Sequence, residues 1–485
     1  MADTTPRSCD IAIRNATIID GTGAPRWRGD IAIAADRIIA LGDLGAMTGA
    51  RDIDASGLVA APGFIDVHTH DDRAVLTENA MLPKISQGVT TVVTGNCGIS
   101  LAPLVLDRAP PPPLDLLGDS AAYRFASFGQ YLEAFSTRPA PVNVAPMVGH
   151  STLRVGTMAD VSRPARDGEI ARMQDLLREA RDAGAVGFST GLYYPPGRAA
   201  PIEEVVALLD VLDGTGALYT THMRNEGDGV EESLEESFET ARRAGVPLVI
   251  SHHKCEGKRN FGRSEKTLRR IEETGRRQPV GLDVYPYAAS STVLLPEFVD
   301  DGLRIIVTWS KPHPEKSGRD LAAVAQEWGV PEREAARRLA PAGAIYFRMD
   351  EADVQRILAY SQTMIGSDGL PHDEHPHPRL WGTFPRVLGH YVRELGLLSL
   401  EDAVRKMTGL TAGRFGLTDR GRLAPGAYAD VVLFDPATVI DRATFEAPKQ
   451  SAAGIALVLV NGEAVYADGA ATGAASGRML LKAHA

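Results

Sequence analysis

The stretch GFIDVHTH, residues 63–70, decides how the rest of the chain is interpreted. Phe64 to Val67 form a short run typical of a buried strand, and His68 and His70 follow it, one residue apart. Side chains alternate between the two faces of a strand, so both imidazoles point the same way. The stretch therefore predicts a strand that brings two potential metal ligands to its C-terminal end.

Seven further apolar segments follow, and longer stretches separate them. Two of these stretches, residues 170–184 and 233–245, have helical periodicity and end on glycine. Eight strands that alternate with helices predict a closed parallel (β/α)8 barrel, with an open doubly wound sheet as the rival. The seven segments are TTVVTG (90–95), VNVAPMVG (142–149), AVGFST (185–190), LYTTHM (218–223), PLVISHH (247–253), VGLDVYPY (280–287) and TMIGSD (363–368).

The two ends of the chain have a different pattern from its middle. CDIAIRNATIID (9–20) alternates apolar and polar positions, and the tail returns to short strands and turns. We expect residues 1–61 and 417–485 to pair into a small β domain beside a catalytic barrel of residues 62–416. The strand–helix rhythm breaks at about 288–345, which predicts an insertion in the barrel.

Composition excludes several classes of protein. The formal net charge is −11 and no cluster of Lys and Arg occurs, which argues against a nucleic-acid partner. No run of 18 apolar residues occurs, which argues against a membrane span. The chain has 3 cysteines, too few for a disulfide framework, and its first residues lack the apolar core of a signal peptide. We expect a cytoplasmic protein; the oligomeric state stays open.

Ligand-type residues recur at the ends of the predicted strands. The active site of a (β/α)8 barrel lies at the C-terminal ends of its strands. One cysteine or histidine alone is more often a packing residue. Five strand ends that all carry such residues are much harder to explain by packing, and they predict a site for a divalent metal. Beyond His68 and His70, these residues are Cys97, His222, the neighbours His252 and His253, and Asp368.

Several longer motifs together carry a family resemblance. With GFIDVHTH, they resemble the D-aminoacylases, or N-acyl-D-amino-acid deacylases, of the amidohydrolase superfamily. The resemblance spans nearly the whole chain, and a cysteine in place of a bridging carboxylate or carbamylated lysine is its most telling detail. The motifs are TGNCG (94–98), STGLYYPPG (189–197), SHHK (251–254), GSDGLPH (366–372) and HPHPRLWGTFPR (375–386).

The resemblance implies roles for individual residues. It implies a tight zinc site made of Cys97, His222 and His252, and the choice of His252 over His253 rests on it. It implies a second, weaker metal position made of His68, His70 and Asp368, with Asp368 also the catalytic acid and base. For the substrate, it implies that the carboxylate is held by Lys254, Tyr285 and Arg379, and that Tyr194, with Tyr193 as the alternative, lies near the scissile carbonyl.

These roles predict zinc-dependent hydrolysis of a small-molecule substrate, an N-acyl-D-amino acid. The alternatives are a cyclic amidohydrolase of the dihydropyrimidinase or hydantoinase kind, a deaminase, and a non-catalytic scaffold. The strand AVGFST has no lysine to form a bridging carbamate, which counts against the cyclic amidohydrolases. The D preference rests on the resemblance alone.

Two further segments lead to expectations about the surroundings of the site. TVLLPEFV (292–299) opens the predicted insertion and has no basic residue before Arg304, which predicts a pocket for apolar side chains such as Leu, Met and Phe. The alternative is that these residues only pack the insertion onto the barrel. The acidic run EGDGVEESLEESFE (226–239) is typical of a solvated helix start.

Overall fold

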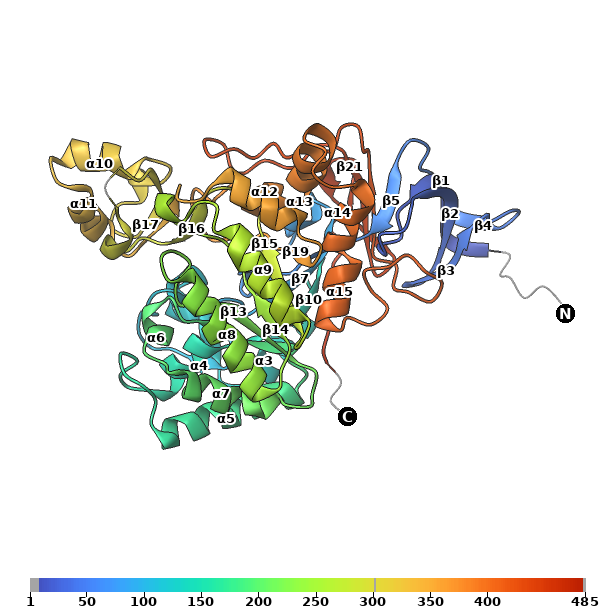
Figure 1. Cartoon of the computed structure of the whole chain (residues 1–485). Helices are drawn as coiled ribbons and strands as arrows, with labels where there is room; N and C mark the ends of the chain where they lie inside the picture. Colours follow the sequence, from blue (N-terminus) through green and yellow to red (C-terminus); the bar gives the residue numbers. More distant parts are fainter. Residues whose placement is uncertain (1–7, 301, 483–485) are drawn as a thin grey trace.

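The structure is a computed structural model that describes residues 8–300 and 302–482. Figure 1 shows three parts: a central barrel with helices around it, an antiparallel sheet on one side, and a mostly helical unit that projects on the other. The sheet contains both blue N-terminal strands and red C-terminal ones, so strands from the first and last parts of the chain share one sheet.

Eight parallel strand positions form the barrel. Strands β10 and β11 are separated only by Met147 and occupy one position. The ring closes between its first and last strands: Thr69 bridges Gly369, and the Asp368 amide donates to the His68 carbonyl over 2.7 Å. The predicted closed barrel is confirmed. In order around the ring, the strands are β6 (Phe64–Asp66), β7 (Val89–Thr94), β10 (Asn143–Pro146) with β11 (Val148–Gly149), β12 (Gly187–Gly191), β13 (Leu218–His222), β14 (Leu248–Ile250), β15 (Val280–Val284) and β19 (Thr363–Ile365).

Helices cover the barrel from outside, so its strands are buried on both faces. Strand β7, for example, has all its residues buried, which suits a run of Val and Thr. Helix α8 packs Leu234 and Phe238 inward and ends at Gly245, whose φ of 67° closes the last turn in the left-handed conformation. The covering helices include α5 (Asp167–Asp182), α7 (Ile202–Leu209), α8 (Val230–Ala244), α9 (Ser264–Gly275), α12 (Glu351–Ala359) and α14 (Leu400–Met407).

The small β domain is a nine-stranded sheet built from both ends of the chain, as predicted. Strand β5 pairs antiparallel with β20, which joins the N-terminal strands to the C-terminal ones. Ile13, Ile33 and Leu459 belong to its own apolar core. The strands are β1 (Ser8–Ile18), β2 (Trp27–Ala34), β3 (Arg37–Gly42), β4 (Thr48–Asp54), β5 (Val59–Pro62), β20 (Val431–Phe434), β21 (Ile455–Val460), β22 (Glu463–Ala467) and β23 (Ala470–Ala471).

A separate unit interrupts the barrel between β15 and α12. Its antiparallel sheet has the order β16-β18-β17, and Figure 1 shows it projecting from the barrel with two helices at its far end. Its first strand runs past the mouth of the barrel, so it contributes to the site. The elements are β16 (Ser290–Val293), β17 (Ile305–Ser310), α10 (Leu321–Trp328), α11 (Glu332–Leu339) and β18 (Ala342–Tyr346).

Two further findings concern membrane spans and disulfides. Within residues 8–300 and 302–482, none of the helices combines the length and the apolar character that crossing a bilayer requires. Cys9, Cys97 and Cys255 are all buried and free.

Candidate metal centre and active site

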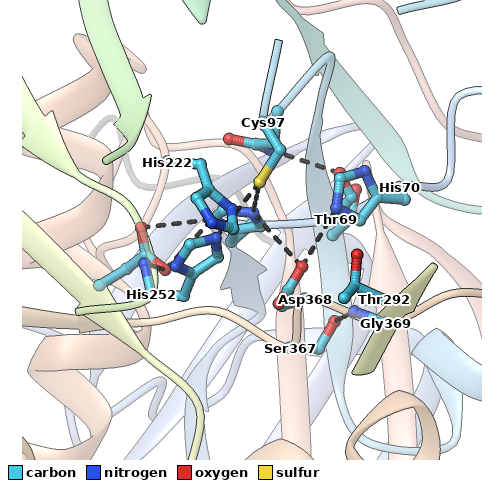
Figure 2. Close-up of polar contacts among 12 residues, drawn as sticks. Thr69, His70, Cys97, His222, His252, Thr292, Ser367, Asp368 and Gly369 are labelled. Atoms are coloured by element: carbon cyan, nitrogen blue, oxygen red, sulfur yellow. Dashed lines mark hydrogen bonds and ion pairs between the residues drawn. The ribbon is translucent and has the colours of Figure 1, made fainter. Parts of the chain in front are cut away.

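The six predicted ligand residues meet at the C-terminal end of the barrel. Each one ends a parallel strand or closely follows it: His68 and His70 after β6, Cys97 after β7, His222 at the end of β13, His252 after β14 and Asp368 after β19. All six are buried, and Figure 2 shows the side chains of His70, Cys97, His222, His252 and Asp368 converging. We call these six residues the floor of the site.

The first ligand group consists of Cys97, His222 and His252. One ligand atom from each lies within 4.8 Å of the other two, and Cys97 Sγ is 3.3 Å from His252 Nε2. Both ring nitrogens of His222 are buried and make no hydrogen bond among the described residues. A thiolate with two imidazoles is a suitable donor set for zinc, and three protein ligands leave a fourth position open. The residues present therefore fit a zinc ion.

The second ligand group consists of His68, His70, Cys97 and Asp368. Asp368 Oδ1 lies 3.1 Å from His70 Nε2 and 3.5 Å from His68 Nε2, and His68 Nε2 lies 3.2 Å from Cys97 Sγ. Cys97 belongs to both groups, so a single sulfur can face two metal positions. The structure thus brings all six predicted ligands together.

The site has two anionic ligands, the Cys97 thiolate and the Asp368 carboxylate, which lie among imidazoles. Burial alone would raise the pKa of the Cys97 thiol, but the imidazoles of His68 and His252 lower the pKa well below its usual value. Burial opposes the charge of His70, yet Asp368 and Cys97 raise its pKa to about 9. The pKa of His222 is also about 9, because Glu226 and Cys97 outweigh burial. A metal that binds at neutral pH must displace these imidazole protons.

Three floor residues have an unusual backbone conformation. Cys97, His252 and Asp368 have φ values of 52°, 36° and 49°, in the left-handed region that side chains other than glycine rarely adopt. Such conformations cost free energy and persist only where the surroundings fix them. All three follow the end of a barrel strand, so the backbone turns sharply just where a ligand must point into the barrel.

A buried carboxylate that the sequence analysis missed supports the first ligand group. Glu226 Oε1 lies 3.1 Å from His252 Nδ1, and Glu226 Oε2 lies 2.7 Å from Lys254 Nζ and 3.3 Å from His222 Nε2. The acidic run from 226 to 239 was expected to be solvated, but its first residue is buried. Its position four residues after His222 could have suggested this role.

Asp283 contacts two floor histidines, and a buried lysine holds the backbone segments beside them. Asp283 Oδ1 accepts a hydrogen bond from the His252 amide over 2.9 Å and lies 3.3 Å from His68 Nδ1. Lys84, on α2 (Leu82–Ile85), donates to Asp66 Oδ2 over 2.8 Å and to Ser367 Oγ over 2.9 Å. These bonds tie β6 to the segment after β19 and so hold the backbone on both sides of the barrel's closure.

The comparison with protein families agrees with this architecture. The model of the Amidohydrolase family matches residues 51–306 and 330–466, which include the barrel strands and every floor residue.

The chain belongs to the amidohydrolase family. It is 56% identical to a D-aminoacylase of Alcaligenes xylosoxydans xylosoxydans, over 99% of each chain. An N-acyl-D-aspartate deacylase of the same organism is 53% identical over 97% of this chain and 95% of the relative. These similarities make the chain a metal-dependent amidohydrolase.

Solved structures extend the comparison to a metal-bound relative. An N-acyl-D-glutamate deacylase from Bordetella bronchiseptica, complexed with zinc and a phosphonate inhibitor that mimics the tetrahedral intermediate, is 49% identical. It aligns with a TM-score of 0.94 over 98% of this chain and 100% of the relative. A dihydropyrimidinase from Brevibacillus agri is 17% identical with a TM-score of 0.62, which is a likeness of fold alone.

This amidohydrolase has a cavity directly above the floor. Lys254 and Tyr285 line it, whereas Arg379 is fully buried behind Asp368, with its Nη2 in an ion pair 2.9 Å from Asp368 Oδ2. Arg379 Cζ lies 4.4 Å and Lys254 Nζ 5.9 Å from the centre of the Tyr285 ring. The structure therefore brings the three residues implied for the substrate carboxylate together, with two of them at the cavity surface.

Both tyrosines that could lie near the scissile carbonyl line the cavity. The Tyr194 hydroxyl is 2.8 Å from Thr292 Oγ1 on β16, and its ring centre is 4.9 Å from that of His222. The ring of Tyr193 stacks on His222 and also on Phe298. Because both rings contact His222, the choice between them stays a prediction.

The geometry separates His252 from its neighbour. His252 belongs to the first ligand group, whereas His253 is buried on the other side of the strand end, with Nε2 2.7 Å from Thr267 Oγ1. Burial lowers the pKa of His253 to about 4, so its imidazole is neutral at physiological pH. Spacing alone allowed either residue as a ligand.

The insertion and a barrel loop form the outer wall of the cavity. We use this term for Phe298, Tyr346 and Arg348 of the insertion and its flank, and Glu256 of the loop after β14. Within TVLLPEFV, Thr292 and Phe298 reach the cavity, but Val293 and Leu294 are buried in the core. Both alternatives for TVLLPEFV therefore apply in part: some of its residues line the cavity, and others pack the insertion onto the barrel.

Proposed function

We propose that the chain hydrolyses the amide bond of N-acyl-D-amino acids to a carboxylate and a free D-amino acid, with zinc as its metal. The observation that carries this proposal is the pair of ligand groups that share Cys97, at the mouth of a barrel that is similar over nearly its whole length to a D-aminoacylase. The chirality of the substrate rests on that similarity.

Zinc would be held by Cys97, His222 and His252, and a second ion by His68, His70 and Asp368. When bound, zinc polarises a carbonyl and lowers the pKa of water to about 7. The protein contributes a buried position with orienting contacts from Glu226 and Asp283, which fix the imidazoles of His252 and His68.

Asp368 moves the protons in this proposal. Burial would raise its pKa, but the Arg379 guanidinium and His68 lower the pKa well below its usual range, so the carboxylate is charged and can accept a proton. Arg379 holds Oδ2, which leaves Oδ1 directed to the floor beside His70. Asp368 takes a proton from the attacking water and returns it to the leaving nitrogen, because an amide leaves readily only once its nitrogen is protonated.

The substrate's α-carboxylate is received by Lys254 and Tyr285, with Arg379 behind them. The side chains form one cationic cluster around the Tyr285 ring. Lys254 Nζ is also paired with Glu226, which holds the Lys254 side chain in place. Tyr194 is positioned beside His222, where a bound carbonyl would lie.

The substrate's side chain is apolar in this proposal, as in D-leucine, D-methionine and D-phenylalanine. Four apolar side chains that line the cavity support it: Ile99, Leu116, Phe298 and Leu370. The relatives act on different side chains by their names, so similarity alone leaves this preference open. A carboxylate placed against apolar side chains would lose hydration without a partner.

The test compares kcat/KM of the zinc-loaded protein for N-acetyl-D-leucine, N-acetyl-L-leucine, N-acetyl-D-glutamate and a hydantoin. We expect the D-leucine derivative to be the best substrate, on the order of 10²-fold above the glutamate derivative. Ring opening of the hydantoin without amine release from any acyl-amino acid would favour a cyclic amidohydrolase instead. Zinc-loaded protein without any turnover would favour a scaffold.

A further inference from the structure

An ion pair crosses the outer wall of the cavity. Arg348 follows β18 of the insertion, and Glu256 lies in the loop after β14. Arg348 Nη1 is 3.2 Å from Glu256 Oε2, and both side chains are 13% exposed. The Gly257 amide also donates to the Arg348 carbonyl over 2.8 Å, so the backbone joins the two segments independently of the ion pair.

The guanidinium is held on several sides but keeps a free donor. Nη2 donates to the Phe298 carbonyl over 2.9 Å, and the ring of Tyr346 lies 4.5 Å from Cζ. Nε is buried and has no hydrogen-bond partner among the described residues. Burial works against the charge of Arg348, yet the Glu256 carboxylate raises its pKa above the ordinary value, so the guanidinium stays charged.

The pair lies where the cavity over the floor meets a wider outer groove. Five residues line both spaces: Tyr193, Glu226, Glu256, Phe298 and Arg348. A substrate bound at the floor therefore extends toward the pair if its side chain is directed outward. Of the charged residues shared by the two spaces, Glu226 is already paired with Lys254, which leaves Arg348 and Glu256 at the boundary that such a side chain reaches first.

We propose that Glu256 masks Arg348 and thereby sets the side-chain specificity of the site. With both charges present, the wall carries no net charge: a side-chain carboxylate meets the repulsion of Glu256 together with the attraction of Arg348. Without the Glu256 charge, the same wall becomes a receptor for a carboxylate, because an arginine with free donors binds one well. The chemical class in question is N-acyl-D-amino acids with acidic side chains. This inference rests on the proposed function.

The test measures the ratio of kcat/KM for N-acetyl-D-glutamate to that for N-acetyl-D-leucine in four zinc-loaded variants. Glu256→Gln should raise the ratio about tenfold or more over wild type, and Arg348→Met should not raise it. The double variant should lose the gain of Glu256→Gln, because no cation remains to be unmasked. Glu297→Gln is the matched control: it removes the same charge from an exposed position in the outer groove and should leave the ratio unchanged.

Several outcomes would overturn the inference. The first is an unchanged kcat/KM ratio in Glu256→Gln. The second is a gain in the ratio that persists when Arg348→Met is added, or that appears equally in Glu297→Gln. Such a gain would reflect the overall electrostatic potential and not the Arg348–Glu256 pair. Binding of the two acyl-amino acids, measured by calorimetry in an Asp368→Asn background, gives the same comparison without turnover. Wild type that turns over no acyl-amino acid would contradict the proposed function, while the binding ratios still decide the role of the pair.

Discussion

The floor of the cavity and its outer wall differ in how the chain builds them. Every floor residue ends or follows a parallel strand of the barrel, and the buried carboxylates of Asp283 and Glu226 contact the floor histidines His68 and His252. The wall joins an insertion to a single barrel loop, and its main polar contact is one partly exposed ion pair. This difference predicts that the floor governs the chemistry and the wall governs the choice of substrate. Substitutions in the floor should change metal content and turnover, and those in the wall should change which substrate is preferred.

The largest effect should come from Cys97→Ala, because both ligand groups share this sulfur. Thiolate is a strong zinc ligand, so we expect the variant to lose its tightly bound zinc and its turnover. The measurement is zinc per chain after dialysis, together with amine release. His68→Ala is the comparison and should keep the zinc held by the first group. The reverse pattern, zinc kept without Cys97 and lost without His68, would show that the two groups have been assigned in the wrong order.

Asp368→Asn comes next and should separate turnover from metal binding within the floor. Asparagine keeps the shape and removes the base, and loss of acid–base catalysis typically costs about 10²–10⁴-fold in rate. We expect such a loss in kcat with zinc retained by Cys97, His222 and His252. If kcat stays near that of wild type in zinc-loaded protein, another group moves the proton.

Glu226→Gln tests whether the carboxylate beside His222 and His252 supports metal binding at the floor. The amide removes the charge that faces Lys254 and His252 and offers donors where the carboxylate accepts. Loss of such an outer contact typically weakens metal binding or activity about 10–100-fold. Competition with a chelator measures the zinc affinity, and Glu232→Gln, exposed on α8, is the matched control. Equal zinc affinities in the two variants would mean that Glu226 orients Lys254 for substrate binding and does not support the metal.

Phe298→Ala should have the smallest effect and should sharpen the contrast with the floor. Removing the ring opens the cavity beside Tyr193, so kcat/KM for N-acetyl-D-leucine should fall about tenfold while zinc content stays the same. Leu295→Ala changes the same insertion away from the cavity and serves as the control. A loss of zinc in Phe298→Ala would show that floor and wall are not separable.

The floor could be predicted from the sequence because its pattern is local. A ligand-type residue after an apolar run is visible in the chain, and the closed barrel then brings such residues together. The pattern could not distinguish His252 from His253, because that choice depends on how the backbone turns after β14, where His252 adopts a left-handed conformation. Glu226 escaped notice because it begins an acidic run that is otherwise typical of a solvated surface.

The wall could be predicted only in part, because it depends on contacts between distant segments. Arg348 faces Glu256 only once β18 has folded back along β16 and returned the chain to the barrel. Within TVLLPEFV, Val293 lies in the paired strand β16 and packs into the core, whereas Phe298 lies beyond that strand and reaches the cavity. The role of Lys84 likewise depends on a distant part of the chain, because Lys84 donates to Ser367 in the segment after β19.

The closure of the barrel between β6 and β19 also sets an order in time. Cys97, His222 and His252 are synthesised before β19, the strand that brings Asp368 into the ring. A nascent chain can thus present its first metal ligands while its acid–base residue is still unmade. On the proposed function, a chain that ends before β19 lacks Asp368 and the closed ring, so we expect it to carry out no hydrolysis.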